Sequence, residues 1–169
     1  MRAARFLLAL AVVLVVHLIA ARLAPPFPRL VDLFLVLIVV NALDGNSLAG
    51  LLGGAAAGLA EDAVGGAYYG LHGIGGAVVG YSVARATQQL EVQQTSMVMI
   101  VFTLAAGVKI VVESALLFLL RDVPPSEPLW LGTSMLTAGL LGAVVVSGGK
   151  AMGRRLHSWR TSRVAKVRI

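Results

Sequence analysis

The sequence contains no cysteine, and only 13% of its 169 residues are charged. Without cysteine the chain cannot form a disulfide, a thiolate metal site or a cysteine nucleophile. Soluble domains carry about 25% charged residues, so this shortage of charge argues against a soluble protein. Hydrophobic residues make up 58% of the chain, and the mean hydropathy is +0.88. We therefore predict an integral membrane protein with no separate soluble domain.

Six apolar segments follow one another along the chain. They cover residues 6–24, 30–42, 47–60, 67–84, 97–120 and 129–146. The second and third would span only about 20 Å as helices, less than a hydrocarbon core of about 30 Å. They could be buried short helices, tilted neighbours or a re-entrant hairpin. We predict an all-α polytopic bundle of about six transmembrane helices in residues 1–149, followed by a basic tail in residues 150–169.

Basic residues are distributed unequally between the two sides of this predicted bundle. With the N-terminus in the cytoplasm, ten lysines and arginines lie on the cytoplasmic side, and three lie outside: Arg22, Arg29 and Arg121. The positive-inside rule then places both termini in the cytoplasm. Seven of the ten belong to the tail, which has no acidic residue and could anchor the topology on lipid headgroups or bind a cytoplasmic partner. Nucleic acid binding is not expected, because these basic residues set the orientation of the chain in the membrane and do not form a basic surface on a folded domain.

Glycine is concentrated in one stretch, where twelve of the 19 glycines lie between Gly45 and Gly80. Gly50, Gly54 and Gly58 recur every four residues, so they share one face of a helix. In water each would weaken a helix by about 1 kcal/mol relative to alanine, but within a membrane such spacing lets two helix backbones approach closely. We predict that this glycine ladder is a helix-packing face or a partner interface.

Charged and histidine residues inside apolar segments are the other candidates, because a charge in hydrocarbon is costly unless it is paired. Lys109 and Glu113 lie four residues apart in the fifth segment and are expected to pair with each other. The pair could be structural, a proton or substrate relay, or a contact for a partner helix. The remaining candidates are Asp32, Glu61, Asp62, His17 and His72. We expect hydrogen-bonded interior residues rather than metal ligands, since none stands at a metal-binding spacing.

Glu61 and Asp62 also invite a catalytic interpretation. Asp62, with Asp44-Gly45 upstream, partly matches the CDP-alcohol phosphotransferase pattern D-x-x-D-G-x-x-A-R-x8-G-x3-D-x3-D, whose carboxylates bind the metal ions that neutralise a diphosphate. The other charged positions of the pattern are occupied here by Asn41, Ala49 and Gly66, and its alanine position by Leu48. We therefore expect no catalytic residue, no metal and no cofactor. The two carboxylates are expected to cap and position helices.

The segments around the glycine ladder resemble the rod shape-determining protein MreD family of small bacterial inner-membrane proteins. The residues that carry the resemblance are Val31 to Leu37, Gly50 to Asp62, Gly70-Leu71-His72 and Val79-Gly80-Tyr81. They are similar to the family's aspartate at the start of the second span, its glycine ladder, a Gly-Leu pair and a Gly-Tyr exit. The family usually has proline directly before the aspartate, where this chain has Val31.

The resemblance implies a non-catalytic scaffold or regulator of the bacterial elongation complex, located in the cytoplasmic (inner) membrane. It implies a fold like the substrate-binding subunits of ECF vitamin transporters, with MreC bound through its transmembrane helix. RodA, a class B penicillin-binding transpeptidase and, indirectly, MreB are the further partners it suggests, in lateral peptidoglycan synthesis and rod cell shape. Two alternatives stay open. One is a small-molecule-binding membrane subunit of an uptake transporter, for which 6% aromatic residues is low, and the less favoured one is the phosphotransferase.

Overall fold

The computed structural model describes residues 2–23, 31–44, 46–65, 68–89 and 95–121, together with residues 137, 140, 144 and 148. Within these residues the chain is helical and has no strand. The helices are α1 (Arg2–Leu23), α3 (Leu33–Ala42), α4 (Ser47–Gly65), α5 (Leu71–Thr87) and α6 (Thr95–Arg121). The predicted all-α class is confirmed for this part of the chain.

The first five predicted segments each correspond to one helix. The sixth, 129–146, lies outside the described residues except at positions 137, 140 and 144, and the tail 150–169 lies outside them entirely. Two described helices are long and apolar enough to cross a membrane, over Ala3–Leu23 and Ser96–Leu120. These two helices are compatible with a membrane protein, and the six-span arrangement stays a prediction.

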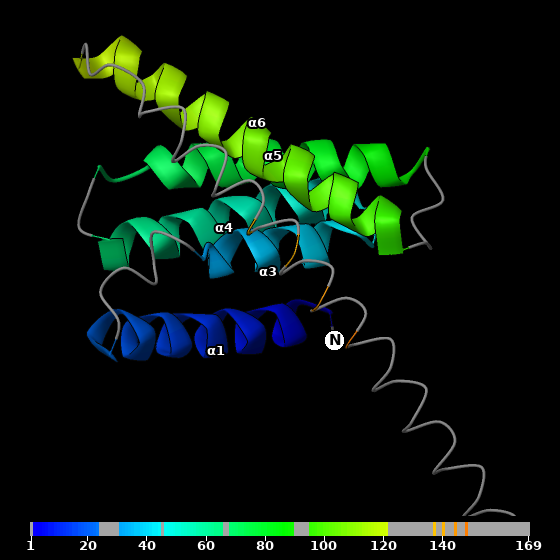
Figure 1. Cartoon of the computed structure of the whole chain (residues 1–169), viewed down its shortest axis with the longest axis horizontal. Coiled ribbons are helices and arrows are strands. Elements are labelled where there is room, and N and C mark those ends of the chain that lie inside the picture. The colour runs from blue at the N-terminus through cyan, green and yellow to red at the C-terminus, as the bar shows by residue number, and fades with distance from the viewer. Residues whose placement is uncertain are drawn as a thin grey trace, which may run out of the picture.

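Successive helices run in opposite directions, with α4 and α5 side by side and α6 crossing next to α5 (Figure 1). The short helix α3 contacts each of the other four described helices. It is therefore a buried short helix, one of the three possibilities that its length allowed. Seven of its ten residues are buried: Phe34, Leu35, Val36, Leu37, Ile38, Val39 and Ala42.

The third predicted segment is longer than expected. The apolar run ends at Ala60, where charged residues follow, but α4 continues to Gly65 and has 19 residues. At a rise of about 1.5 Å per residue, α4 is about 28 Å long, so it is not a short element. The helix continues because Glu61 and Asp62 find polar partners inside the bundle, as described below.

The glycine ladder of α4 packs directly against the backbone of α5. A Cβ atom on each ladder glycine would overlap a carbonyl group of α5: Gly50 meets Gly80, Gly54 meets Gly76 and Gly58 meets His72. The relation is reciprocal, since a Cβ on Gly76 or Gly80 would overlap the α4 backbone. The ladder is therefore a helix-packing face that is already filled from within the chain. Because a partner has no room there, its possible role as a partner interface is not supported.

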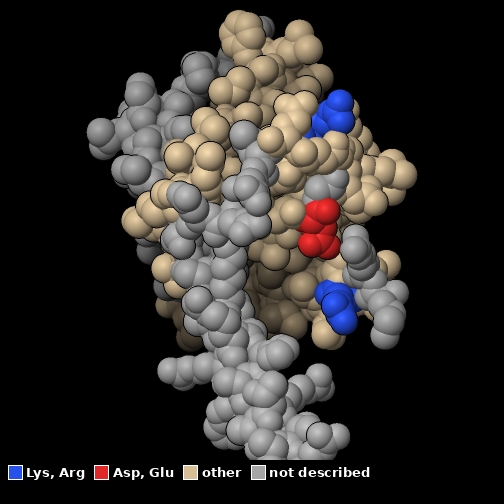
Figure 2. Space-filling view, turned by 90° about the vertical axis from the view of Figure 1, so that its right-hand side faces the viewer, with Lys and Arg blue, Asp and Glu red and all other residues tan. Residues whose placement is uncertain are grey.

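Among the residues that the structure describes, charged side chains are sparse at the end of the bundle that carries the start of α1 and the α3–α4 turn. Figure 2 shows this end as mostly uncharged residues with a few separate charged ones. Arg5, Asp44 and Arg85 belong to this end and are exposed. Most of the acidic residues that the structure describes lie elsewhere, inside the helix bundle.

Candidate functional site

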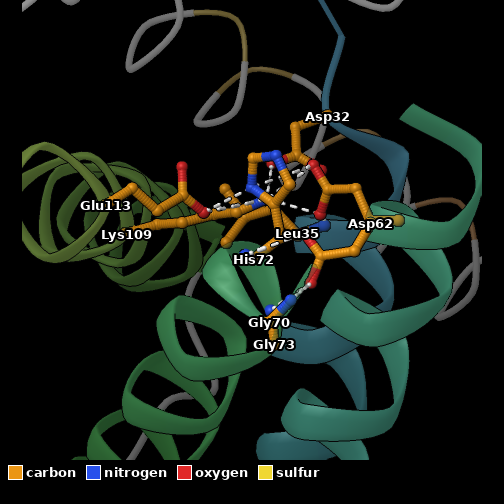
Figure 3. Close-up of polar contacts among 9 residues, drawn as sticks. Asp32, Leu35, Asp62, Gly70, His72, Gly73, Lys109 and Glu113 are labelled. Atoms are coloured by element: carbon orange, nitrogen blue, oxygen red, sulfur yellow. Dashed lines mark hydrogen bonds and ion pairs between the residues drawn. The ribbon is translucent and has the colours of Figure 1, made fainter. Parts of the chain in front are cut away.

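Six side chains from α3, α4, α5 and α6 meet inside the bundle (Figure 3). We call them the polar cluster. Its members are Asp32, Glu61, Asp62, His72, Lys109 and Glu113. All six were candidates from the sequence, where they are scattered over more than 80 residues. The fold brings them together because α3 and α5 begin, and α4 ends, beside the middle of α6 (Figure 1).

Lys109 is the centre of the polar cluster and is only 4% exposed. Its Nζ atom donates to Asp32 Oδ2 at 2.5 Å and to the two Glu61 carboxylate oxygens at 2.7 and 3.0 Å. Three acceptor oxygens thus match the three protons of an ammonium group. The expected contact with Glu113 exists, but at 3.9 Å it is the longest of the set. The predicted Lys109–Glu113 ion pair is therefore present, but Asp32 and Glu61 are the closer partners of Lys109.

Asp32 begins α3 and joins that helix to Lys109. Its Oδ1 atom accepts a hydrogen bond from the backbone N–H of Leu35 at 2.7 Å, which is the geometry of an N-terminal cap. Its other oxygen accepts from Lys109. One side chain therefore both starts the buried helix α3 and fixes it to α6.

Asp62 caps the start of α5 from the neighbouring helix. Its two oxygens accept hydrogen bonds from the backbone N–H groups of Gly70 at 2.8 Å, His72 at 3.1 Å and Gly73 at 3.2 Å. These donors belong to the helix start, where no intrahelical acceptor exists. Asp62 is only 1% exposed, so the three bonds satisfy a charge that would otherwise be buried without partners. The prediction of a helix cap is confirmed for Asp62, whereas Glu61 binds Lys109 and caps no helix among the described residues.

The loop before α5 has a glycine where the backbone requires one. Gly70 has a φ of 92°, in the left-handed backbone region that residues other than glycine rarely adopt. This conformation turns the chain so that the first N–H groups of α5 point at Asp62 (Figure 3). The structural role of Gly70 and Gly73 could have been predicted, because the Gly70-Leu71-His72-Gly73 run is a recognisable turn and helix start.

His72 connects α5 to α6. Its Nδ1 atom lies 2.8 Å from Glu113 Oε1 and 3.8 Å from Glu61 Oε1. An ionised carboxylate can only accept, so Nδ1 is the donor in the shorter contact. Gly75 leaves room for this pair, because a Cβ at that position would press on the Glu113 side chain. No local sequence pattern predicts this role of Gly75, because Glu113 is 38 positions away.

The polar cluster is closed at its centre and more open around it. Side-chain exposure is 5% for Lys109, but 28% for Asp32, 24% for His72, 17% for Glu61 and 16% for Glu113. Lysine therefore holds the centre of the cluster, while the aspartate, the histidine and the two glutamates lie nearer the surface. Among the residues that the structure describes, no three His, Asp or Glu side chains are arranged to hold a metal ion.

The carboxylates of the phosphotransferase pattern do not converge. Asp44 precedes α4 and Asp62 lies near its end, so the two are separated by almost the whole helix, about 27 Å at 1.5 Å per residue. Asn41 donates a hydrogen bond to the Ala49 carbonyl at 3.2 Å, which ties the end of α3 to α4. Gly66 lies outside the described residues. This geometry gives the phosphotransferase alternative no support.

His17 differs from the other candidates because it does not join the polar cluster. Its ring packs against Phe34 of α3, with 5.1 Å between the ring centroids. Its Nδ1 atom is buried and has no hydrogen-bond partner among the described residues. The expectation of a hydrogen-bonded interior residue is therefore wrong for this nitrogen.

Two apolar hollows lie along the contact between α5 and α6. One, of about 380 Å³, is near the start of α5 and is lined by Tyr68, Tyr69, Gly70, Leu71, Ile74, Leu116, Leu117 and Leu120. Glu113 stands one turn before Leu116 and Leu117 on the same face of α6, so this pocket adjoins the polar cluster. The other, of about 170 Å³, lies nearer the end of α5, between Val79, Val83, Leu104 and Val108.

Comparison of the chain with protein-family models, with curated proteins and with solved structures finds no match. The function is therefore inferred from the polar cluster, the glycine ladder and the outer faces of the helices. Of these, the polar cluster carries the most chemical information, because it gathers the buried charges of four helices into one network.

Proposed function

We propose that this chain is a non-catalytic membrane scaffold of the MreD type, which binds MreC and supports lateral peptidoglycan synthesis. The observation that carries the proposal is that the polar cluster bonds to itself and to the start of α5. Buried charges that are satisfied by one another hold helices in place, and leave the outer surface apolar. The arrangement is that of a structural core inside a bundle that other helices can contact.

The outer faces of α1 and α6 are the surfaces that such a scaffold offers to lipid and to partners. On α1, Leu7 and Leu8 are 60% and 69% exposed, and on α6, Leu104 and Val111 are 62% and 67% exposed. In a bilayer these side chains contact lipid or another transmembrane helix. Because Lys109 is occupied by Asp32 and Glu61, we place the MreC helix on an outer apolar face and not on a Lys109–Glu113 face.

The proposal includes a location and further partners. The bundle lies in the bacterial cytoplasmic membrane with both termini in the cytoplasm, as the distribution of arginine and lysine favours. In that orientation the polar cluster is in the outer half of the bundle, because α3 and α5 start there. RodA and a class B penicillin-binding transpeptidase are proposed to join through MreC, and MreB to be linked indirectly.

Co-purification tests this proposal. Tagged chain and MreC are expressed together, solubilised in mild detergent and purified through the tag, and we expect MreC to be retained. The matched control is MreC with its transmembrane helix replaced by an unrelated one, which we expect to be lost. If MreC is never retained, and if deletion of the gene leaves cell width unchanged, the proposal is wrong.

A second candidate function is favoured by the pocket beside the start of α5. Its volume of about 380 Å³ is in the range of small-molecule sites, and Tyr68 and Tyr69 provide aromatic rings that the low overall aromatic content did not lead us to expect. This would suit a small-molecule-binding subunit of an uptake transporter. Native mass spectrometry tests it. A bound mass that disappears in Leu117→Trp, which fills the pocket, would favour the transporter subunit, and an empty wild-type protein would count against it.

A further inference from the structure

His72 is the point at which three helices exchange polar contacts. It belongs to the first turn of α5, and its Nδ1 atom lies 2.8 Å from Glu113 on α6 and 3.8 Å from Glu61 on α4. Its backbone N–H is held by Asp62. With 24% of its side chain exposed, it is the cluster member, after Asp32, with the greatest access to solvent.

The charged groups near His72 differ in how many partners they have. Asp62, from α4, is satisfied by three backbone N–H groups, and Lys109, from α6, is engaged by Asp32 of α3 and by Glu61 of α4. Glu113, in contrast, lies 3.9 Å from Lys109, and its one hydrogen-bonding partner among the described residues is His72. When His72 is neutral, Lys109 is the one cation beside the carboxylates of Asp32, Glu61 and Glu113. When His72 is protonated, it is a second cation beside them.

We propose that His72 is a pH-sensitive latch between α5 and α6. Protonated His72 places a positive charge between Glu61 and Glu113. This charge attracts the Glu113 carboxylate and so draws that part of α6 against the start of α5. Loss of that proton leaves two carboxylates on either side of an uncharged ring, in an interior where unpaired charge is costly. The contact between α5 and α6 then loosens at this end. Histidine is suited to the role because it commonly changes charge between about pH 5 and about pH 8.

The rest of the fold confines the movement to one end of one interface. At Gly50 and Gly54 the α4–α5 contact is made by backbone and small residues, and its titratable groups, Glu61, Asp62 and His72, lie at the end where α5 starts. The other end of the α5–α6 contact is lined by apolar residues such as Val79, Val83 and Ala105. Beside the latch, the three atoms nearest to a Cβ placed on Gly75 would all belong to the Glu113 side chain. The proposal concerns the helices alone and does not depend on the partner proposed above.

A pair of spin labels tests the latch, and the absence of native cysteine makes site-specific labelling clean. Ile74→Cys on α5 and Leu117→Cys on α6 line the same pocket beside the latch. Ser82→Cys and Leu104→Cys line the apolar hollow at the other end of the interface and serve as the control pair. In lipid nanodiscs we expect the first distance to lengthen as pH rises from about 5 to about 8, the range over which histidine loses its charge, while the control distance stays constant.

Two substitutions determine whether His72 causes the change. His72→Gln keeps a side-chain donor near Glu113 but cannot titrate, so the pH-dependent lengthening should be lost. Glu113→Gln removes the charge that protonated His72 binds, so the lengthening should be lost there as well, and this variant decides the matter if His72→Gln does not fold. A first distance that is independent of pH in the otherwise unsubstituted chain, or one that lengthens as before in either variant, would overturn the proposal.

Discussion

The interface between α4 and α5 and the interface between α5 and α6 are built from different groups. Along the glycine ladder the first is a backbone contact in which Gly54 of α4 lies against Gly76 of α5 with no space for a Cβ atom, and its charged contacts are confined to the start of α5. The second combines apolar packing with ionic contacts, and its polar part depends on His72 and Glu113. The first interface is therefore sensitive to side-chain volume, and the second is sensitive to charge. The following predictions separate sensitivity to charge from sensitivity to side-chain volume, in these interfaces and in the ion pairs of α6 with α3 and α4 beside them, from the largest expected effect to the smallest.

Replacing the central cation should have the largest effect. In Lys109→Met the side chain keeps its length, but Asp32 and Glu61 lose their shared cation, and breaking a buried ion pair typically costs about 3–5 kcal/mol. The free energy of unfolding in detergent should fall by that amount. The control is Arg85→Met at an exposed position, where about 0.5 kcal/mol or less is expected. Equal losses in the two variants would show that the cluster is not a buried ionic core.

Enlarging a ladder glycine should be nearly as damaging. In Gly54→Leu the new side chain would occupy the position of the Gly76 backbone, so α4 and α5 must separate, with a cost of about 3 kcal/mol or more. Gly65→Leu is the matched control on the same helix, because a Cβ there meets no atom of the described residues within 4 Å. Thermal unfolding of both variants measures the difference. If Gly54→Leu is as stable as Gly65→Leu, close backbone packing does not hold α4 to α5.

Removing the cap of α5 should have a moderate and local effect. Asp62→Ala leaves the N–H groups of Gly70, His72 and Gly73 without their acceptor, and one buried unsatisfied donor costs about 1–3 kcal/mol. Hydrogen exchange should accelerate at these three amides, while amides in the middle of α5 remain protected. Unchanged exchange at the three amides would contradict the capping role.

Truncation on the outer surface should hardly affect folding. Leu104→Ala removes a side chain that is 62% exposed, so the free energy of unfolding should change by about 0.5 kcal/mol or less. If MreC binds this face of α6, the same substitution should reduce the amount of MreC that co-purifies. A large loss of stability would show that Leu104 packs within the bundle, and unchanged co-purification would direct attention to α1.

The glycine ladder and the cap could be predicted because they depend on local spacing and on residue type. Gly50, Gly54 and Gly58 identify a packing face at intervals of four, and Asp62 suits a cap wherever a helix starts nearby. The matching glycines of α5, Gly76 and Gly80, have the same spacing. Spacing alone does not predict that these two helices pack against each other.

The main partners of Lys109 could not be predicted for the same reason. Its contacts with Asp32 and Glu61 join residues that are 77 and 48 positions apart, whereas Glu113 is four positions away. Local spacing favours the near residue, but the packing of four helices decides the geometry. The extension of α4 beyond Ala60 has the same cause, since Glu61 and Asp62 remain helical only because distant groups satisfy them.

The central claim is that Lys109 ties α6 to α3 and α4 through buried ion pairs, and a double-mutant cycle between Lys109→Met and Glu61→Gln tests it most directly. Once Lys109 is gone, neutralising Glu61 removes an unpaired buried charge. The double variant should therefore be more stable than Lys109→Met alone, with a coupling energy of about 2 kcal/mol, within the range seen for contacting residues. If the two effects add to within about 0.5 kcal/mol, the residues do not interact and the account of the polar cluster is wrong.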